Sequence, residues 1–189
     1  MNKPGDIGLA AVPSLRPAAD VPGPARADTQ ARLTAYLDSV DLDWELGHRD
    51  GEYVVTLPGD QKQRTVVSLL VRDRTTSVSA FVIRNPDENH EEFYRYLLRH
   101  NLRLAGVAYA VDGDGDVYVR GQLPNEAVDE RRLDELLGVV LAAADAAFNE
   151  LLVLGFLTSM RKEWAWRVSR GESTANLEAF RHLLEGDPR

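Results

Sequence analysis

Apolar residues recur at alternating spacings of four and three over the last third of the chain, from Leu133 to Leu154. This spacing predicts an amphipathic helix within residues 128–166 that has one face on a core. Most remaining positions between Leu136 and Leu157 are apolar too, so a second face of the same helix also needs cover. A single sheet cannot cover both faces. We therefore expect the extra surface to pack against another helix of the chain or against a second copy. The first stripe comprises Leu133, Leu137, Val140, Ala144, Ala147, Leu151 and Leu154.

The length of this predicted helix indicates that it does not run straight over one domain. A continuous helix over residues 128–166 would be about 60 Å long, which is more than one small domain can cover. We expect it to bend, to protrude or to pair with another helix. Gly155 is the predicted break, because glycine in a helix interior costs about 1 kcal/mol relative to alanine.

Upstream of this helix, the apolar pattern changes between a helical and a strand period. A helix of about three turns is expected from Asp28, with Leu33 and Leu37 on its buried side. Alternating apolar and polar residues then predict four strands, with a hairpin turn at Asp50-Gly51, where glycine supplies a positive φ angle. These strands are expected around residues 44–46, 53–57, 65–71 and 78–83.

A second helix and two further strands complete the predicted order of elements. The helix begins either at Asn85-Pro86 or slightly later with Asn89 as its cap. It ends at His100-Asn101, where asparagine tolerates the left-handed conformation. The predicted fold is α+β, with about five to six antiparallel strands, helices packed on one face, and the order α-ββββ-α-ββ-α(-α). The last two strands are expected within residues 104–111 and 117–123, and a short final helix over residues 174–184.

Composition limits the partners and the location. The 189-residue chain has a formal net charge of −8 and a pI near 5.0, so we expect no nucleic-acid partner. Five of its nine prolines lie in residues 1–26, and we expect a disordered Pro-rich tail there. An α+β domain over residues 27–170 and a C-terminal helical extension over residues 171–189 should follow. Neither a signal peptide nor a membrane-spanning helix is predicted, so the expected location is the cytoplasm.

No residue pattern indicates catalysis or metal binding. Asp112, Asp114 and Asp116 have the spacing of a calcium loop. Val117 and Leu123 stand where that loop requires glycine and a bidentate glutamate, so we predict a hairpin turn. The chain has no cysteine, no Gly-x-Ser-x-Gly turn and no Gly-rich loop that would hold a phosphate. We therefore expect a protein that is not an enzyme and that uses neither a metal nor a cofactor. The four histidines are scattered: His48, His90, His100 and His182.

The candidate partner-binding residues lie in the segment 160–170, which is basic in an otherwise acidic chain. Tryptophan and arginine are the residue types that most often anchor binding surfaces. An acidic peptide or an acidic patch on another protein would suit this segment best. The alternative is structural: Trp164 packs back on the sheet, and the cations complement the negative end of the helix dipole. The candidates are Arg161, Lys162, Trp164, Trp166 and Arg167.

A further pattern extends over residues 31–157 and consists mostly of positions that define a fold. It comprises Leu97, Leu98, Asn101, Gly106, Asp112 to Asp116, Leu123-Pro124, Leu133, Phe148-Asn149 and Gly155-Phe156. In these positions the chain resembles the actinobacterial branch of the YbjN-type family, whose members are described as sensory transduction regulators. The resemblance implies a fold similar to that of type III secretion chaperones, which commonly dimerise, and it carries over no catalytic residue. The Pro-rich head and the chain after about Arg170 lie outside it.

Two functional hypotheses follow from these patterns. The first is a non-enzymatic regulator or adaptor that forms a homodimer and presents a groove to a protein client, with no membrane partner. The second is a small-molecule sensor that binds a ligand in the cleft between the sheet and the helices. An exposed apolar patch or strand edge rimmed by charge would favour the adaptor, and a buried pocket with a few converging polar groups would favour the sensor.

Overall fold

The computed structural model describes residues 24–185 of the chain. The disorder predicted for the tail therefore lies outside the described residues, except for residues 24–26, which already belong to the first helix. This helix begins earlier than the predicted start at Asp28, because proline is well suited to the first turn of a helix. The helices are α1 (Pro24–Ser39), α2 (His90–Asn101), η1 (Asn125–Ala127), α3 (Glu130–Ala146), α4 (Phe148–Arg170), η2 (Ala175–Phe180) and α5 (Arg181–Leu184).

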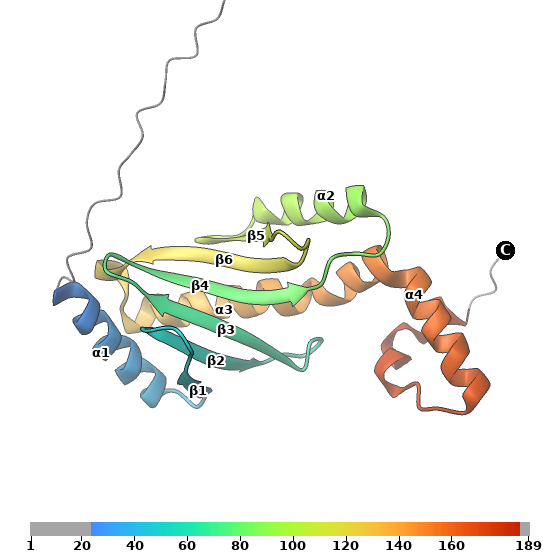
Figure 1. Ribbon diagram of the computed structural model, residues 1–189, viewed down its shortest axis with the longest axis horizontal. Coiled ribbons are helices and arrows are strands. Elements are labelled where there is room, and N and C mark those ends of the chain that lie inside the picture. Colours follow the sequence, from blue (N-terminus) through green and yellow to red (C-terminus); the bar gives the residue numbers. More distant parts are fainter. Residues whose placement is uncertain (1–23, 186–189) are drawn as a thin grey trace, which may run out of the picture.

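Six strands form one antiparallel sheet, which confirms the predicted α+β fold (Figure 1). The strands are β1 (Asp43–Leu46), β2 (Glu52–Pro58), β3 (Arg64–Val71), β4 (Thr75–Ile83), β5 (Val107–Val111) and β6 (Val117–Pro124). Their order in the sheet is β1-β2-β3-β4-β6-β5, so every neighbour except β6 beside β4 is joined by a hairpin. Gly51 has a φ of 78° in the β1–β2 turn, as the Asp50-Gly51 dipeptide predicts.

The main core lies between the sheet and the helices α1 and α3 (Figure 1). Alternate strand residues such as Val55, Leu69 and Val119 point into this layer and are fully buried, because successive strand side chains face opposite sides of a sheet. Leu33 of α1 and Leu133 of α3 meet them from the helix side. Hydrogen bonds also join α1 to the segment that precedes α3. Arg32 of α1 donates hydrogen bonds to the backbone oxygens of Asn125 and Val128.

Helix α2 lies at the β5 edge of the sheet, and Asn101 ties the two together. The Asn101 side chain donates to the Tyr109 carbonyl and accepts from the Tyr109 N–H at 2.7 Å. It therefore occupies hydrogen-bonding groups on the free edge of β5, where another strand would otherwise pair. The predicted left-handed helix end at Asn101 is wrong, since the residue is helical. Asn89, at the start of α2, is the left-handed residue instead, with a φ of 53°.

The long helix predicted over residues 128–166 is present but is interrupted at Ala147 rather than at Gly155. Asp145, two residues earlier, is buried and accepts backbone N–H groups from the β2–β3 loop. Gly155 lies within α4 and serves close packing: a Cβ added there would lie 2.8 Å from Pro86 and 3.0 Å from Phe93. The predicted break at Gly155 is therefore wrong, because the missing side chain admits neighbours and does not turn the chain.

By length and composition alone, the 41-residue stretch Glu130–Arg170 would be long and apolar enough to cross a membrane. Core helices of water-soluble proteins pass the same test, so this is weak evidence for a membrane span. The buried residues of α3 pack on the sheet. Those of α4 pack on α2 and on the C-terminal elements.

The predicted final helix over residues 174–184 forms as two short pieces, η2 and α5, which fold back on α4 (Figure 1). Leu177, Phe180 and Leu184 are buried there. They cover part of the second apolar face of α4, including Met160 and Trp164, which are also buried. The chain thus provides some of the cover that this face requires, but not all of it.

Candidate functional site

An apolar groove runs along α4, on the side that faces the end of β4. Its open volume is about 510 Å³. Phe81 is on the strand side and is 40% exposed, although large apolar side chains on this strand otherwise point into the core. Phe148, Leu152, Phe156 and Met160 follow one another at helical spacing on α4. We call this surface the α4 groove, and it is lined by Lys62, Phe81, Val82, Ile83, Arg84, Phe148, Leu152, Phe156, Ser159, Met160, Glu163 and Leu177.

The β2–β3 loop closes one end of the α4 groove with Lys62. The Lys62 ammonium donates a hydrogen bond to the Phe81 carbonyl and lies 5.1 Å and 5.9 Å from the ring centroids of Phe81 and Phe148. Burial lowers the pKa of Lys62, and the nearby Asp145 carboxylate opposes that shift. Asp145 fixes the loop itself, because its oxygens accept the backbone N–H groups of residues 60–62.

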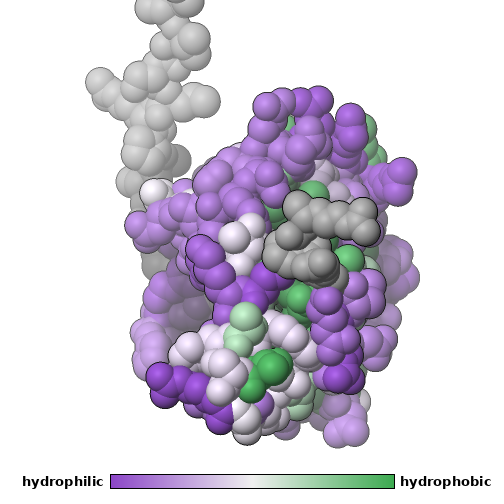
Figure 2. Space-filling view, turned by 90° about the vertical axis from the view of Figure 1, so that its right-hand side faces the viewer, coloured by the Kyte–Doolittle hydropathy of each residue, from purple (hydrophilic) through white to green (hydrophobic). Residues whose placement is uncertain are grey.

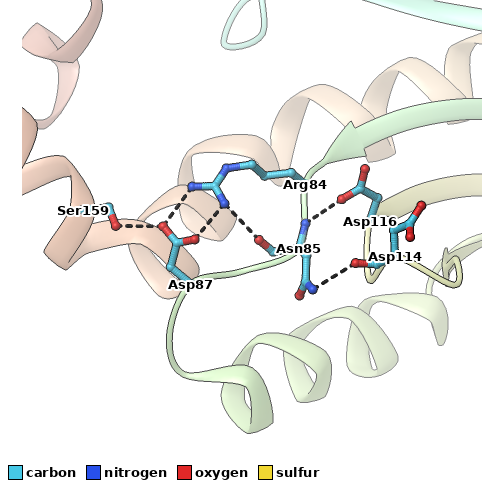
Figure 3. A network of polar contacts seen from close by, with 6 residues as sticks. All are labelled: Arg84, Asn85, Asp87, Asp114, Asp116 and Ser159. Atoms are coloured by element: carbon cyan, nitrogen blue, oxygen red, sulfur yellow. Dashed lines mark hydrogen bonds and ion pairs between the residues drawn. The ribbon is translucent and has the colours of Figure 1, made fainter.

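The segment between β4 and α2 fastens α4 to the sheet (Figure 3). Arg84 donates to both oxygens of Asp87 at 2.7 and 2.8 Å, and Ser159 of α4 donates to the same carboxylate. These contacts lower the pKa of Asp87 to about 2, with the Arg84 hydrogen bonds as the larger cause. Asn85 joins the segment to the β5–β6 turn, since its N–H donates to the Asp116 carboxylate and its side chain to the Asp114 carbonyl.

A second contact of the same kind follows one residue later. Thr158 of α4 donates both its backbone N–H and its hydroxyl to the Glu88 carboxylate, which lowers the pKa of Glu88. The N–H groups of Asp87 and Glu88 donate in turn to the Gly155 carbonyl. This segment therefore helps to fix the position of α4, and with it the shape of the α4 groove.

Apolar side chains also reach the surface on the other side of α4. A hollow of about 520 Å³ there is lined by Tyr96, Val153 and Leu154 together with Phe180 and Leu183 of the C-terminal elements. Viewed from this end of the molecule, apolar patches interrupt a largely hydrophilic surface (Figure 2). Apolar side chains therefore reach the surface on two sides of the α4 arm, which is formed by α4 and the elements that follow it.

The outer face of α2 is a separate apolar surface. Leu98 and Leu102 are 69% and 87% exposed, and Tyr94 is half-buried beside them. The helix has acidic residues in its first turn and basic residues in its last turn. We call this surface the α2 face, and it is lined by Glu91, Tyr94, Arg95, Leu98, Arg99 and Leu102.

The structure does not bring the five candidate partner-binding residues together. Trp164 is buried, with the Arg181 guanidinium 5.9 Å from its ring centroid, whereas Trp166 is 44% exposed. The structural alternative is therefore right in that Trp164 packs back. The predicted packing of Trp164 on the sheet is wrong, because Trp164 packs on the C-terminal elements. Arg161 donates to the Leu183 carbonyl and Arg167 pairs with Glu163, while Lys162 is exposed.

The alternating pattern of β4 could have indicated the α4 groove from the sequence. Positions 77 and 79 are serines on the outer parity of the strand, and Phe81 continues that parity with an aromatic residue. A large apolar side chain at an outward position indicates a second packing surface. The residues on α4 itself were visible as its second apolar face.

The predicted turn at residues 112–116 is confirmed as a hairpin between β5 and β6. The Asp112 carboxylate accepts the N–H groups of Asp114 and Asp116, and Gly115 has a φ of 88°. Within residues 24–185, no three His, Cys, Asp or Glu side chains are placed to hold a metal ion. Two Asp carboxylates of this turn instead serve backbone hydrogen bonds.

The cleft that a ligand sensor would need between the sheet and the helices is filled by core side chains. Val67, Val78 and Val117 of the sheet and Val140 of α3 are essentially inaccessible to solvent. A polar hollow of about 270 Å³ exists on the opposite face of the sheet. It is lined by serines together with Arg49 and Arg120, and it lies outside the layer between the sheet and the helices. Of the two features that distinguish an adaptor from a sensor, the described part of the chain therefore has the apolar groove with charged rims and lacks a pocket between the sheet and the helices.

Comparison with known proteins places the chain in a family. A protein of Mycobacterium tuberculosis, the uncharacterized protein Rv0487, is 52% identical over 130 residues, which is 69% of this chain and 71% of the relative. The uncharacterized protein ML2442 of Mycobacterium leprae is 49% identical over 136 residues, 71% and 74% of the two chains. Both relatives fit the actinobacterial resemblance.

Solved structures with a similar fold include the ExsC–ExsE complex, with a TM-score of 0.47 and 15% identity over 67% of this chain and 95% of that chain. The Yersinia pestis type III secretion chaperone SycH, in complex with a fragment of YscM2, has a TM-score of 0.46 and 20% identity over 61% and 96%. At these values the likeness concerns the general arrangement of the elements only. Residues 29–153 match the model of the YbjN family, described as "Putative bacterial sensory transduction regulator", and the chain belongs to this family.

Proposed function

We propose that this protein is a non-enzymatic adaptor of bacterial regulation that holds an apolar segment of a client protein in the α4 groove. The observation that supports the proposal is the partly exposed row of Phe81, Phe148 and Leu152 between charged rims. These side chains forgo the free energy of burial while they face water, and a bound apolar segment would supply it.

The chemistry of the α4 groove suits a protein segment. Phe81 and Phe148 are partly exposed and give large, rigid anchoring surfaces, and Leu152 continues the apolar row along α4. The lining residues of α4 run from Phe148 to Glu163, so a helix or an extended segment would lie along them. The charged rims would face the solvent-exposed side of such a segment, as in the rims of other protein interfaces.

Self-association through the α2 face is the second part of the proposal. Two copies of α2 packed antiparallel about a two-fold axis would bury Leu98 and Leu102 of both chains. The acidic first turn of each helix would then lie beside the basic last turn of the other. The partly positive start of each helix would also lie beside the partly negative end of the other. One helix face makes a small interface, so we expect a weak dimer that forms at micromolar concentrations.

The client site is tested by recovery of partners from the native host with matched variants. Leu152→Asp and Phe81→Asp place a charge in the α4 groove, and Leu46→Asp places one at a 70% exposed position on β1 outside it. We expect a polypeptide that is recovered with the wild type and Leu46→Asp but lost with both groove variants. Equal recovery with all four proteins, when each melts at a similar temperature, would contradict the client site.

Self-association is tested by light scattering on the full chain at increasing concentration. The wild type should pass from monomer to dimer, and Leu98→Glu should remain monomeric because it places a carboxylate at the centre of the α2 face. Leu46→Glu is the control and should dimerise as the wild type does. A wild type that stays monomeric up to hundreds of micromolar would contradict this part of the proposal and leave the client site untouched.

A further inference from the structure

Lys62 differs from the other charged residues that line the α4 groove. Its ammonium lies over two aromatic rings that belong to the groove, and its side chain is half-buried. No carboxylate of the described residues lies within 4.0 Å of it. Asp145 acts on it from a greater distance, and the Asp145 oxygens already accept three backbone N–H groups.

The other two charged residues of the groove lining are neutralised by neighbours. Arg84 forms a two-pronged ion pair with Asp87 and stacks 4.3 Å from the Phe156 ring centroid. Glu163 forms an ion pair with Arg167 at 2.6 Å. Neither of them requires a charge from a bound segment. Among the charged residues that line the groove, Lys62 is therefore the one without an ion-pair partner in the described part of the chain.

We infer that the α4 groove selects protein segments in which a carboxylate side chain stands at one end of an apolar stripe, so that the carboxylate meets Lys62. This inference rests on the proposed function of the groove and adds the chemical class of the client. A partly dehydrated ammonium gains more from a carboxylate than an exposed one does, because water screens the pair less. The aromatic rings beneath Lys62 hold its ammonium near the groove.

The inference also fixes the direction of the bound segment. Its acidic residue would lie between Phe81 and Phe148, and its apolar stripe would extend past Leu152 and Phe156 toward Met160. A segment with its charge at the other end would leave Lys62 without a carboxylate and would place its own beside the Glu163–Arg167 ion pair, which needs no further charge. The groove would therefore accept one direction of the segment and reject the reverse.

The test measures binding of two synthetic helical peptides to the full chain by fluorescence anisotropy. Both peptides carry a leucine stripe of three turns, and they differ in one position at the end of the stripe, glutamate in one and glutamine in the other. We expect the glutamate peptide to bind about tenfold more tightly, as for one charge-assisted hydrogen bond at a partly buried site. Lys62→Gln should abolish the difference. Arg64→Gln removes a cation from the same hairpin at an exposed position outside the groove and should preserve it.

The outcomes separate the two levels of the proposal. Equal binding of the two peptides by the wild type, or a difference that survives in Lys62→Gln, would overturn the inference and leave the client site in place. Failure of both peptides to bind at millimolar concentration would overturn the client site as well. Displacement of the bound glutamate peptide by dodecanoate at a lower concentration than by unlabelled peptide would overturn the inference, because the groove would then prefer a fatty acid to a protein segment.

Discussion

The sheet layer and the α4 arm use apolar residues in opposite ways. Between the sheet and the helices α1 and α3, alternate strand residues meet one helical stripe, and side chains such as Val55 and Leu133 are fully buried. Along α4 the apolar residues are as dense in sequence, but Phe81 and Leu152 remain partly exposed beside them. The first region accounts for the fold. The second has more apolar surface than the chain itself covers.

The difference shows how the second apolar face of the long helix is shielded from water. Part of it is covered by the chain, because η2 and α5 bury Met160 and Trp164. Part of it packs on α2 through Gly155 and Phe93. The remainder forms the α4 groove. Of the two kinds of cover expected from the sequence, another helix of the chain provides part, and self-association is proposed for the α2 face.

The largest expected difference between the regions is in the stability cost of truncation. Leu133→Ala in the sheet layer should lower the free energy of unfolding by about 2–5 kcal/mol, as for a fully buried leucine. Leu152→Ala in the α4 groove should cost only about 1 kcal/mol, because the side chain is partly exposed. Urea denaturation measures both. Equal costs would mean that the α4 groove is part of the core.

Substitution of two helix glycines should give the next largest difference in stability between the two regions. Gly155→Ala should destabilise by about 1–3 kcal/mol, since the new methyl group would collide with Pro86 and Phe93. Gly138→Ala on the exposed side of α3 meets no atom within 4 Å and should stabilise by about 0.5–1 kcal/mol. Thermal melts of both variants check the sign. A stabilising Gly155→Ala would contradict the close packing of α4 on the segment before α2.

Acid should loosen the α4 arm through Asp87. Its pKa in the folded protein, about 2, lies below the ordinary value of 3.8, so its contribution to stability is present above pH 3.8 and is lost as the pH falls through 2. The effect should be less than about 1 kcal/mol, because the carboxylate is partly exposed. Asp87→Asn should reduce the stability lost between pH 4 and pH 2. An unchanged acid profile in Asp87→Asn would remove this ion pair from the account of how α4 is held.

The smallest expected effect concerns the charges of the α2 face, at about 0.5 kcal/mol for each pair. In the proposed antiparallel dimer, Glu91 of one copy lies near Arg99 of the other. Glu91→Arg and Arg99→Glu should each weaken the homodimer, whereas a mixture of the two variants should form a heterodimer with opposite charges at both contacts. Sedimentation of the separate and mixed proteins measures this. Equal association in all samples would exclude the antiparallel arrangement.

Periodicity was enough to predict the strands, their pairing in hairpins and the main helical stripe, because each of these depends on local spacing. The positions of helix breaks were not predictable in the same way. Gly155 looks like a break in sequence, yet its role depends on Pro86 and Phe93, which are remote in the chain. The α4 groove and the burial of Trp164 were hidden for the same reason. Both depend on where η2 and α5 fold back, and the short segment 172–185 has little periodicity of its own.

The central claim is that the apolar surface left open along α4 is occupied by another polypeptide in the cell. Site-specific photocrosslinking in the native host tests it most directly, with benzoylphenylalanine in place of Leu152 in the α4 groove or of Val66, an exposed apolar residue of β3. We predict a discrete crosslinked product from position 152 and none from position 66. Absence of a product at position 152, or equal products at both positions, would contradict the claim.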